Sequence, residues 1–254
     1  MSIKNQAELT GLQKASQAVA RTLKAMMAYA RPGMSTRQLD KFGAACLRQY
    51  GATSAPNKAY GFPGYTCISV NQEFCHGIPG PRVLQPGDLV NIDVSAEVNG
   101  FWADNGASFV LGPDVYGHQQ LVNASQYILN KAISQIRAGV AIAQIGQLMH
   151  TEALKRGYQV IKNLTGHGVG RKLHEAPDNL ANYKIRGDRR RFEANMVIAL
   201  ETFIATHSSQ AVTLPDGWTM VGNRGGYMAQ HEHTLVVQAN RPPLVLTAQN
   251  GIPG

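Results

Sequence analysis

Apolar and polar positions alternate with two different periods along the chain, and the order of these periods repeats. Helical periodicity, with apolar residues three and four positions apart, runs over about 6–29 and again over about 116–137. A turn and a second helix fit each of the segments that follow, 31–51 and 137–157. Strand-like runs come after each pair of helices. The pattern predicts a duplicated unit of two helices followed by strands.

The two second-helix segments also align with each other in sequence. Each predicts a turn, a helix of about four turns and a glycine that ends the helix. The matching pairs are Arg31 and Arg137, Gly33 and Gly139, Gln38 and Gln144, Leu39 and Ile145, Gly51 and Gly157. We therefore expect a single domain, 1–254, with pseudo-symmetric halves at about 1–112 and 113–254. The joining segment 111–117 is too short for a flexible tether, so the functional site is expected between the halves.

Residues 88–112 carry the most informative strand pattern. Asn99 and Gly100 lie between two apolar runs and predict a hairpin with a type I′ turn, which needs positive φ at both central positions. This turn sets the opposing pairs Asp93 with Gly106 and Ser95 with Asp104. Asp93 and Asp104 then share one face as diagonal neighbours, about 7–8 Å apart at Cα, close enough to hold shared ions.

Two interpretations of this acidic hairpin face are open. The opposite face carries an apolar run that fits a core: Val90, Ile92, Val94 and Ala96. If Asp93 and Asp104 are also buried, the cost of unpaired buried charge requires a partner, and a metal ion supplies one. If their face meets solvent, the aspartates need no partner.

Glu201 and Glu232 are acids within apolar, strand-like runs. Glu201 closes the run NMVIALETFIAT, where alternation gives it apolar neighbours on its own face. Glu232 lies in MAQHEHTLVVQ and shares a face with Gln230. Because His231 points to the opposite face, we discount it as a ligand to the same ion. Either acid alone would more often form a salt bridge.

The glycine-rich segment GHGVGRKLHEAP holds His167 and His174. Its glycines allow sharp turns and a close approach of the backbone to a ligand. A histidine beside glycines is by itself a weak signal. Two Asp, two Glu and one His together form the hard, oxygen-rich donor set that is typical of sites for two catalytic divalent ions.

Composition narrows the cellular setting. The chain is 44% hydrophobic and 16% charged, as in ordinary globular proteins. No stretch approaches the roughly 20 apolar residues of a membrane span, and the polar N-terminus lacks the apolar core of a secretory signal. The cysteines Cys46, Cys67 and Cys75 are too few for a disulfide framework, so we expect a reducing, cytoplasmic location.

The net charge of +8 raises the question of a polyanionic partner. The densest basic patch comprises Arg186, Arg189, Arg190 and Arg191. Transient association with the ribosome is one interpretation. The alternative is a solvated loop that favours solubility, since no nucleic-acid-binding motif accompanies the arginines.

From the first helix to about Gln238, the chain resembles type I methionine aminopeptidases. The matching pieces are CHGIPG with His76, Asp93 and Asp104 with 10 residues between them, GHGVGRKLHEAP with His167 and His174, Glu201 at a strand end, and QHEHT with Glu232. The resemblance implies the pita-bread fold, an α+β architecture of pseudo-twofold helix-helix-strand halves whose antiparallel sheets form a central cleft. It also implies a monomeric hydrolase that removes the initiator methionine from nascent polypeptides, preferentially before small residues.

The same resemblance implies two divalent ions, of cobalt, manganese, iron or zinc, without deciding among them. Asp93 would chelate one ion and Asp104 and Glu232 would bridge both. His167 and Glu201 would complete the coordination of the second ion.

Three residues receive catalytic roles from this resemblance. Glu201 would relay a proton from the attacking water, His174 would steady the tetrahedral intermediate, and His76 would contact the scissile amide. The methionine pocket would comprise Phe62, Cys67, Leu173 and Trp218, with Tyr60 and Tyr65 nearby. Asn105 stands where the family usually has threonine or serine, and Thr202 stands where it usually has proline. Both departures bear on how neighbouring residues tune the metal ligands.

Two alternatives compete with this interpretation. A proline-specific peptidase of the same fold would share all five ligands, but His76 lies too early for the large N-terminal domain that such enzymes usually carry. A non-catalytic pita-bread binding module would typically have lost ligands, and here the set is complete. Only 26 residues separate His174 from Glu201, without the insertion of the type II enzymes, which favours type I.

Overall fold

The computed structural model describes residues 1–252, and its elements follow the predicted order. The first half contains α1 (Gln6–Tyr29), α2 (Thr36–Gln49), β1 (Thr53–Ser54), α3 (Ala55–Tyr60), β2 (Cys67–Val70), β3 (Glu73–Cys75), β4 (Leu89–Asp93), β5 (Ala96–Val98), β6 (Phe101–Ala103) and β7 (Gly106–Val110). The second half contains α4 (Gln119–Gln135), α5 (Ile142–Lys155), β8 (Gln159–Val160), β9 (Thr165–Gly168), β10 (Glu175–Ala181), β11 (Val197–Ala205), β12 (Ala211–Thr213), β13 (Met220–Gly222), β14 (Met228–Val236) and β15 (Leu244–Val245). The four predicted helices are confirmed. Within this described part, no helix has the length and apolar character to cross a membrane.

Local sequence explains where the paired helices begin. The side chain of Asn5 accepts a hydrogen bond from a first-turn backbone N–H of α1. Ser35 and Gln38 form a reciprocal capping box at the start of α2, which satisfies N–H groups that have no partner within the helix. The turns before α2 and α5 contain Gly33 at φ 87° and Gly139 at φ 86°. The repeated glycines therefore make the same backbone turn in both halves.

A nine-stranded antiparallel sheet joins the two halves. Its main path is β10-β9-β11-β14-β7-β4-β2, with β15 paired to β14 and β8 to β11. In chain order, β2, β4 and β7 approach the centre from one side, while β9, β11 and β14 approach it from the other. The halves repeat one strand order about the β7–β14 junction, which is the pseudo-twofold arrangement that the sequence predicts.

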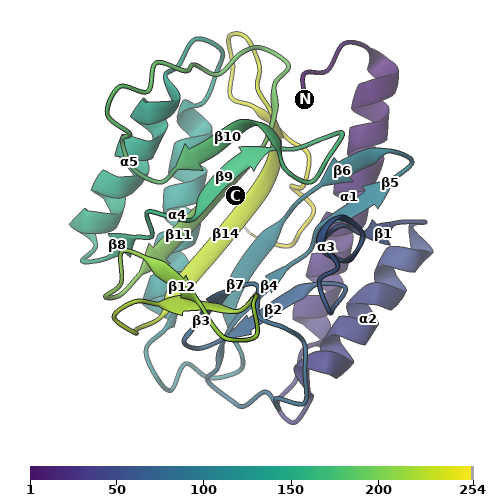
Figure 1. Ribbon diagram of the computed structural model, residues 1–254, viewed down its shortest axis with the longest axis vertical. Helices are drawn as coiled ribbons and strands as arrows, with labels where there is room; N and C mark the ends of the chain where they lie inside the picture. The colour runs from purple at the N-terminus through teal and green to yellow at the C-terminus, as the bar shows by residue number, and fades with distance from the viewer. Residues whose placement is uncertain (253–254) are drawn as a thin grey trace.

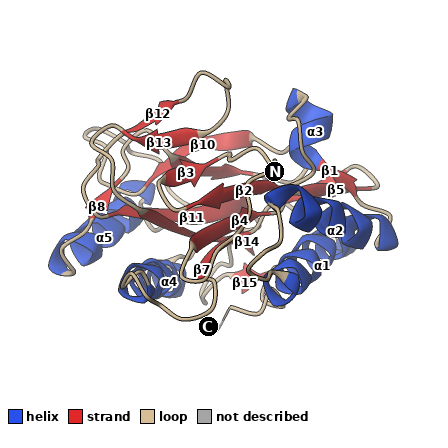
Figure 2. Ribbon diagram, turned by 90° about the horizontal axis from the view of Figure 1, so that it is seen from below, coloured by secondary structure: helices blue, strands red, loops and turns tan. Residues whose placement is uncertain are grey.

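The four long helices cover one face of this sheet. Figures 1 and 2 show the pairs α1–α2 and α4–α5 on the same side, at opposite ends of the sheet, with α4 packed on β11 and β14 and α1 on β4. Each helix pair encloses its own apolar core. The small sheet β12-β13-β3 and the short helix α3 lie on the other side. A cavity can form on that side of the sheet.

The hairpin has the register that its turn predicts. Asn99 and Gly100 adopt φ values of 51° and 81°, and Asp93 pairs with Gly106. The ladder is interrupted before Asp104, because β4 and β7 belong to the large sheet whereas β5 and β6 join β1 in a small one. Both aspartates therefore lie where the hairpin leaves the large sheet.

Alternation along the central strands also follows the prediction, with one correction. Ile198 and Leu200 of β11 and Ala229 and Leu235 of β14 belong to the core beneath α4 and α5. The sequence predicts Glu201 at a strand end, whereas the residue lies at the middle of β11. The strand continues because the apolar run that follows the acid stays paired with β14 as far as Ala205 with Met228.

Replacing Gly33 or Gly139 by alanine should each destabilise the fold by about 1–2 kcal/mol, because positive φ is unfavourable for a residue with a Cβ. A Cβ at either position would meet no atom within 4 Å, so the cost is conformational. We expect similar losses in the free energy of unfolding measured in urea. Gly80→Ala is the control, since its added Cβ would have its nearest atom at 3.7 Å. A loss at one turn and none at the other would contradict their equivalence.

Candidate metal centre

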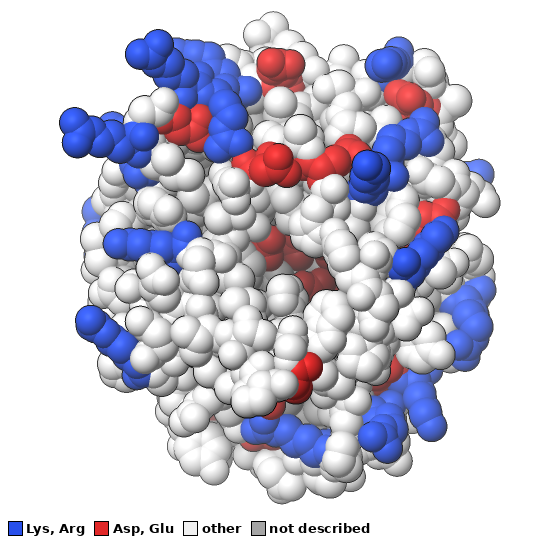
Figure 3. All heavy atoms as spheres, in the orientation of Figure 1, with Lys and Arg blue, Asp and Glu red and all other residues white. Residues whose placement is uncertain are grey.

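A cavity of about 340 Å³ opens on the sheet face opposite the four long helices, and the short helix α3 lines part of it. Figure 3 shows it as a hollow near the middle of this face, with acidic atoms in its floor. Four predicted ligands line it: Asp93, Asp104, His167 and Glu201. Glu232 lies directly opposite Glu201 in the neighbouring strand. The cavity thus collects residues from both halves of the chain.

The sheet explains how these side chains converge. Asp93 ends β4, Asp104 follows β6, and His167 lies in β9 beside Ala199 of β11. These positions place each of them at the cavity, on the face opposite the four long helices. The metal interpretation of the acidic hairpin face is therefore favoured over the solvent-facing one, since Asp104 is 5% exposed.

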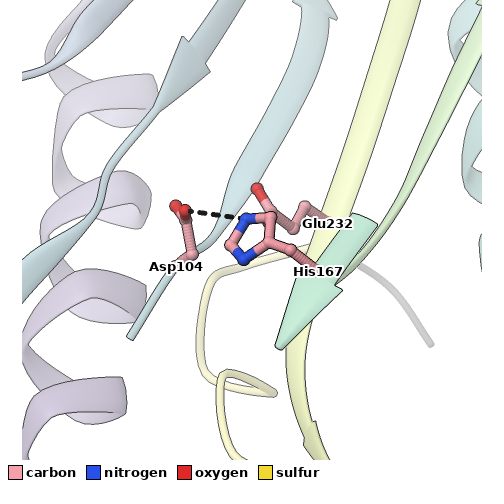
Figure 4. Close-up of side chains that lie close together, drawn as sticks. All are labelled: Asp104, His167 and Glu232. Carbon is pink, nitrogen blue, oxygen red and sulfur yellow. Dashed lines mark ion pairs between the residues drawn. The ribbon is translucent and has the colours of Figure 1, made fainter. Parts of the chain in front are cut away.

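Three ligands form the tightest group. The donor atoms of Asp104, His167 and Glu232 all lie within 4.8 Å of one another (Figure 4). Nε2 of His167 is 3.7 Å from Oδ2 of Asp104. Asp93 and Glu201 lie outside this triad but line the same cavity. The structure therefore brings all five predicted ligands to one place.

Burial raises the pKa values of all four carboxyl groups, and repulsion between them adds to this effect. Burial raises the pKa of Asp93 to about 6. Burial, reinforced by the charges of Asp93 and Glu201, raises the pKa of Asp104 well above its usual range. The pKa values of Glu201 and Glu232 rise in the same way, through burial first and neighbouring carboxylates second. A bound cation would reverse these shifts by compensating the crowded charge.

The donor atoms fit a divalent cation. Oε1 of Glu232 is buried without a hydrogen-bond partner, which is costly for a carboxylate oxygen. Nδ1 of His167 donates to the carbonyl oxygen of Gly168 at 2.9 Å, which leaves Nε2 as the acceptor atom facing Asp104. Burial lowers the pKa of His167 to about 3, so the ring is neutral at physiological pH. Carboxylate oxygens and a neutral imidazole suit manganese, iron, cobalt or zinc.

Gln230 contacts two predicted ligands, a role that the sequence interpretation did not assign to it although it placed Gln230 on the face of Glu232. Its Nε2 donates to Glu201 at 3.0 Å and to Glu232 at 3.2 Å, while its Oε1 accepts from Asn91 at 2.8 Å. The position opposite this amide is Gly106, where a Cβ would lie within 2.7 Å of Nε2 of Gln230. The sequence does contain a signal for this role. Asn91 lies two residues before Asp93 and Gln230 two residues before Glu232, so each amide shares a strand face with a predicted ligand.

Two further histidines surround the ligands. The ring centroid of His174 lies 4.1 Å from that of His167, and the Tyr60 hydroxyl is 2.7 Å from Nδ1 of His174. His76 lines the cavity with positive φ, 53°. Loss of hydration lowers the pKa of His76 and of His174, so both rings favour the neutral form.

The predicted methionine pocket is largely assembled. Phe62 and Trp218 meet edge to face with ring centroids 5.2 Å apart, and Cys67 and Leu173 line the same cavity. The cavity wall also includes residues that the sequence did not assign to the pocket: Cys75, Leu164 and Phe203. These three are buried apolar residues, and periodicity alone does not distinguish a cavity wall from a core.

The prediction for Tyr65 requires a correction. Tyr65 is not among the residues that line the cavity, and its side chain is 45% exposed. The carboxylate of Asp40 accepts hydrogen bonds from the backbone N–H groups of Tyr65 and Thr66, and the carbonyl of Tyr65 accepts one from Ser54. These bonds fix the backbone in a position that leaves the phenol toward solvent.

Comparisons with known proteins agree with this geometry. Residues 10–239 match the model of metallopeptidase family M24. Methionine aminopeptidase 2 of Bacillus subtilis is 46% identical over 97% of this chain and 99% of its own length. Methionine aminopeptidase of Staphylococcus epidermidis is 40% identical over 96% and 98%, respectively.

Solved structures extend the likeness to the fold. Methionine aminopeptidase of Thermotoga maritima superimposes with a TM-score of 0.92 at 29% identity, covering 97% of this chain and 99% of that one. Prolidase from Pyrococcus furiosus gives a TM-score of 0.76 at 20% identity, covering 96% of this chain and 65% of that one. The second likeness concerns the fold alone. The expected pita-bread fold is confirmed.

The carboxyl groups of the cavity should lower the stability of the metal-free protein as the pH rises above their unfolded-state pKa values of about 4. Raised pKa values mean that Asp104, Glu201 and Glu232 hold protons in the folded state that the unfolded state releases, so stability falls until the pH passes the folded-state values. Buried histidines with lowered pKa values act in the opposite direction. Because the wild type and a Glu232→Gln variant share these histidines, the histidine contribution cancels in the difference between the two proteins.

Glu232→Gln should make this slope shallower, because it removes one proton-binding carboxyl and relieves repulsion on the others. The measurement is the difference in the free energy of unfolding between variant and wild type against pH, from about pH 5 to 9, in the presence of a chelator. Glu152→Gln is the control, since hydrogen bonds from Arg156 and neighbouring lysines hold the pKa of Glu152 at about 2, far below the window. An unchanged slope in Glu232→Gln would contradict the pKa assignment.

Proposed function

This chain belongs to metallopeptidase family M24, and from that membership we propose that it removes the N-terminal methionine from newly made polypeptides at the carboxylate-rich cavity. The observation that carries the proposal is the convergence of Asp93, Asp104, His167, Glu201 and Glu232 on one cavity. Identity of 40–46% over nearly the whole chain to methionine aminopeptidases supports the same activity.

We propose that the cavity holds two divalent ions. Asp93 would bind one ion, Asp104 and Glu232 would bridge the two, and His167 and Glu201 would complete the second. The partnerless oxygen of Glu232 and the crowding of the carboxylates support this assignment. When bound, the ions supply Lewis acidity that polarises the scissile carbonyl and acidifies a water molecule. Manganese, iron, cobalt and zinc all suit the donor set.

Protein groups around the ligands are suited to the proton transfers of peptide hydrolysis. Glu201, held by Gln230, is the carboxylate that would take a proton from the attacking water and pass it to the leaving amine. If the Tyr60 hydroxyl donates to Nδ1 of His174, then Nε2 of His174 carries the ring proton and can donate to the developing oxyanion. His76 at the cavity wall would contact the scissile amide.

The apolar wall gives the site its side-chain selectivity. Phe62 and Trp218, with Cys67 and Leu173, form a pocket that suits an unbranched thioether, because sulfur contacts aromatic edges favourably. We propose that methionine occupies this pocket. A small second residue is expected in the substrate, as for the family that the sequence resembles.

The cellular setting is also a proposal. We propose a cytoplasmic monomer that meets nascent chains at the ribosome. Within the basic patch, Arg190 bonds to Asp188 and Arg191 to the carbonyl oxygen of Gly139, so both have structural partners. Ribosome contact would therefore depend on Arg186 and Arg189.

The competing functions have weaker support. Proline-specific peptidases share the fold at 20% identity, and the chain spans only about two-thirds of the prolidase compared here. A non-catalytic module would not need to maintain five metal-binding donors around one cavity. Both alternatives predict that methionine release is absent.

Release of methionine from Met-Ala-Ser by the purified protein tests the function. The protein is stripped of metal and given manganese, cobalt, iron or zinc in turn. We expect release that depends on added metal and no cleavage of an Ala-Pro peptide. Cleavage of Ala-Pro alone would favour the proline-specific alternative, whereas a folded, metal-loaded protein without either activity would favour the binding module.

Glu232→Ala should abolish methionine release together with metal binding, because it removes a bridging carboxylate. His174→Ala should retain metal binding and lower kcat by about 10²–10³-fold through loss of an oxyanion donor. The measurements are kcat, KM and metal affinity for each variant. His207→Ala, which removes an exposed histidine, should match the wild type. A His174→Ala variant with unchanged kcat would remove this residue from the mechanism.

A further inference from the structure

The segment after β15 packs against the strand face behind the metal centre. Thr247 and Asn250 are both fully buried, although they lie close to the end of the described chain. Asn250 contacts Asn105, which follows Asp104 in the sequence. Thr247 contacts His233, which follows Glu232. We call Thr247 and Asn250 together the C-terminal clamp.

Asn250 holds the side chain of the residue that follows Asp104. Its Nδ2 donates to Oδ1 of Asn105 at 2.8 Å, and the backbone N–H of Asn105 donates to Oδ1 of Asp104 at 2.9 Å. Nδ2 of Asn105 is buried without a partner, so the bond from Asn250 is what fixes this side-chain amide. Asn250 therefore holds the residue whose N–H bonds to one oxygen of Asp104.

Thr247 holds the strand beside Glu232. Its hydroxyl lies 2.8 Å from Nδ1 of His233 and accepts a hydrogen bond from the backbone N–H of Thr234 at 3.1 Å. The hydroxyl of Thr234 in turn donates to the carbonyl oxygen of Asp104 at 2.7 Å and accepts from the N–H of Asp104 at 3.0 Å. Through Thr234, the clamp joins the strand of Glu232 to the loop of Asp104.

We propose that the C-terminal clamp positions Asp104 and Glu232 relative to each other for metal binding. This inference rests on the proposed function, because it concerns the same metal centre. Asp104 belongs to the first half of the chain and Glu232 to the second, and the backbone ladder between β7 and β14 has one residue pair, His231 with Ala107.

A bond from the N–H of Gln230 to Oγ of Ser108 also joins these strands. The clamp adds the bond from Asn250 to Asn105 and supports Thr234, and ligand geometry determines metal affinity through such hydrogen bonds.

Thr247→Val and Asn250→Ala test the proposal, with Mn²⁺ as the probe and isothermal titration calorimetry of the metal-free protein as the measurement. We expect each variant to bind Mn²⁺ about 10-fold more weakly or worse, the range found for groups that orient metal ligands. Thr247→Ser keeps the hydroxyl and should retain wild-type affinity. Gln249→Ala removes an exposed hydrogen bond to Arg21 in the same segment and should also leave affinity unchanged.

Thermal unfolding without metal separates positioning from general stability. A positioning role predicts that affinity falls in variants whose metal-free melting temperature stays close to that of Gln249→Ala, and that Asn105→Ala and Asn250→Ala are not additive in their effects on affinity. Unchanged Mn²⁺ affinity in both clamp variants, with a wild type that binds the ion, would overturn the clamp alone. A folded wild type that neither binds Mn²⁺ nor releases methionine would overturn the proposed function and the clamp with it.

Discussion

Four carboxylates converge at the junction of the two halves, and their mutual repulsion is the constraint on which the rest of the structure depends. Burial raises the pKa of each, and Oε1 of Glu232 has no hydrogen-bond donor at all. A sheet that ended in such a cluster without compensation would be destabilised by several kcal/mol. Cations bound in the cavity would compensate this charge. The crowded carboxylates that destabilise the metal-free fold are therefore the same groups that would hold the ions for hydrolysis.

The duplicated architecture makes this convergence accessible to a short chain. Each half presents three strands in the same order, and the four long helices cover a single face. The opposite face is left free where β7 meets β14, with one half supplying Asp93 and Asp104 and the other His167, Glu201 and Glu232. Gln230 and the C-terminal clamp then support the ligands from two sides, by hydrogen bonds to the carboxylates and to the adjacent backbone.

Sequence reasoning recovers whatever depends on local periodicity. The Asn99–Gly100 turn determines the hairpin register, and the two-residue period assigns Asp93, Glu201 and Glu232 to the cavity face. Contacts between distant segments carry no such period. The sequence therefore placed Tyr65 at the pocket without revealing that Asp40 fixes its backbone elsewhere. The sequence interpretation also places Glu201 at a strand end, whereas pairing with β14 continues beyond it.

The central claim is that these five side chains hold two divalent ions, and anomalous X-ray diffraction from crystals soaked in Mn²⁺ tests it most directly. The account predicts two anomalous peaks in the cavity, both contacted by Asp104 and Glu232, with Asp93 at one and His167 and Glu201 at the other. A single peak would reduce the centre to one ion. Peaks bound by other residues, or an empty cavity in a protein that releases methionine, would contradict the account.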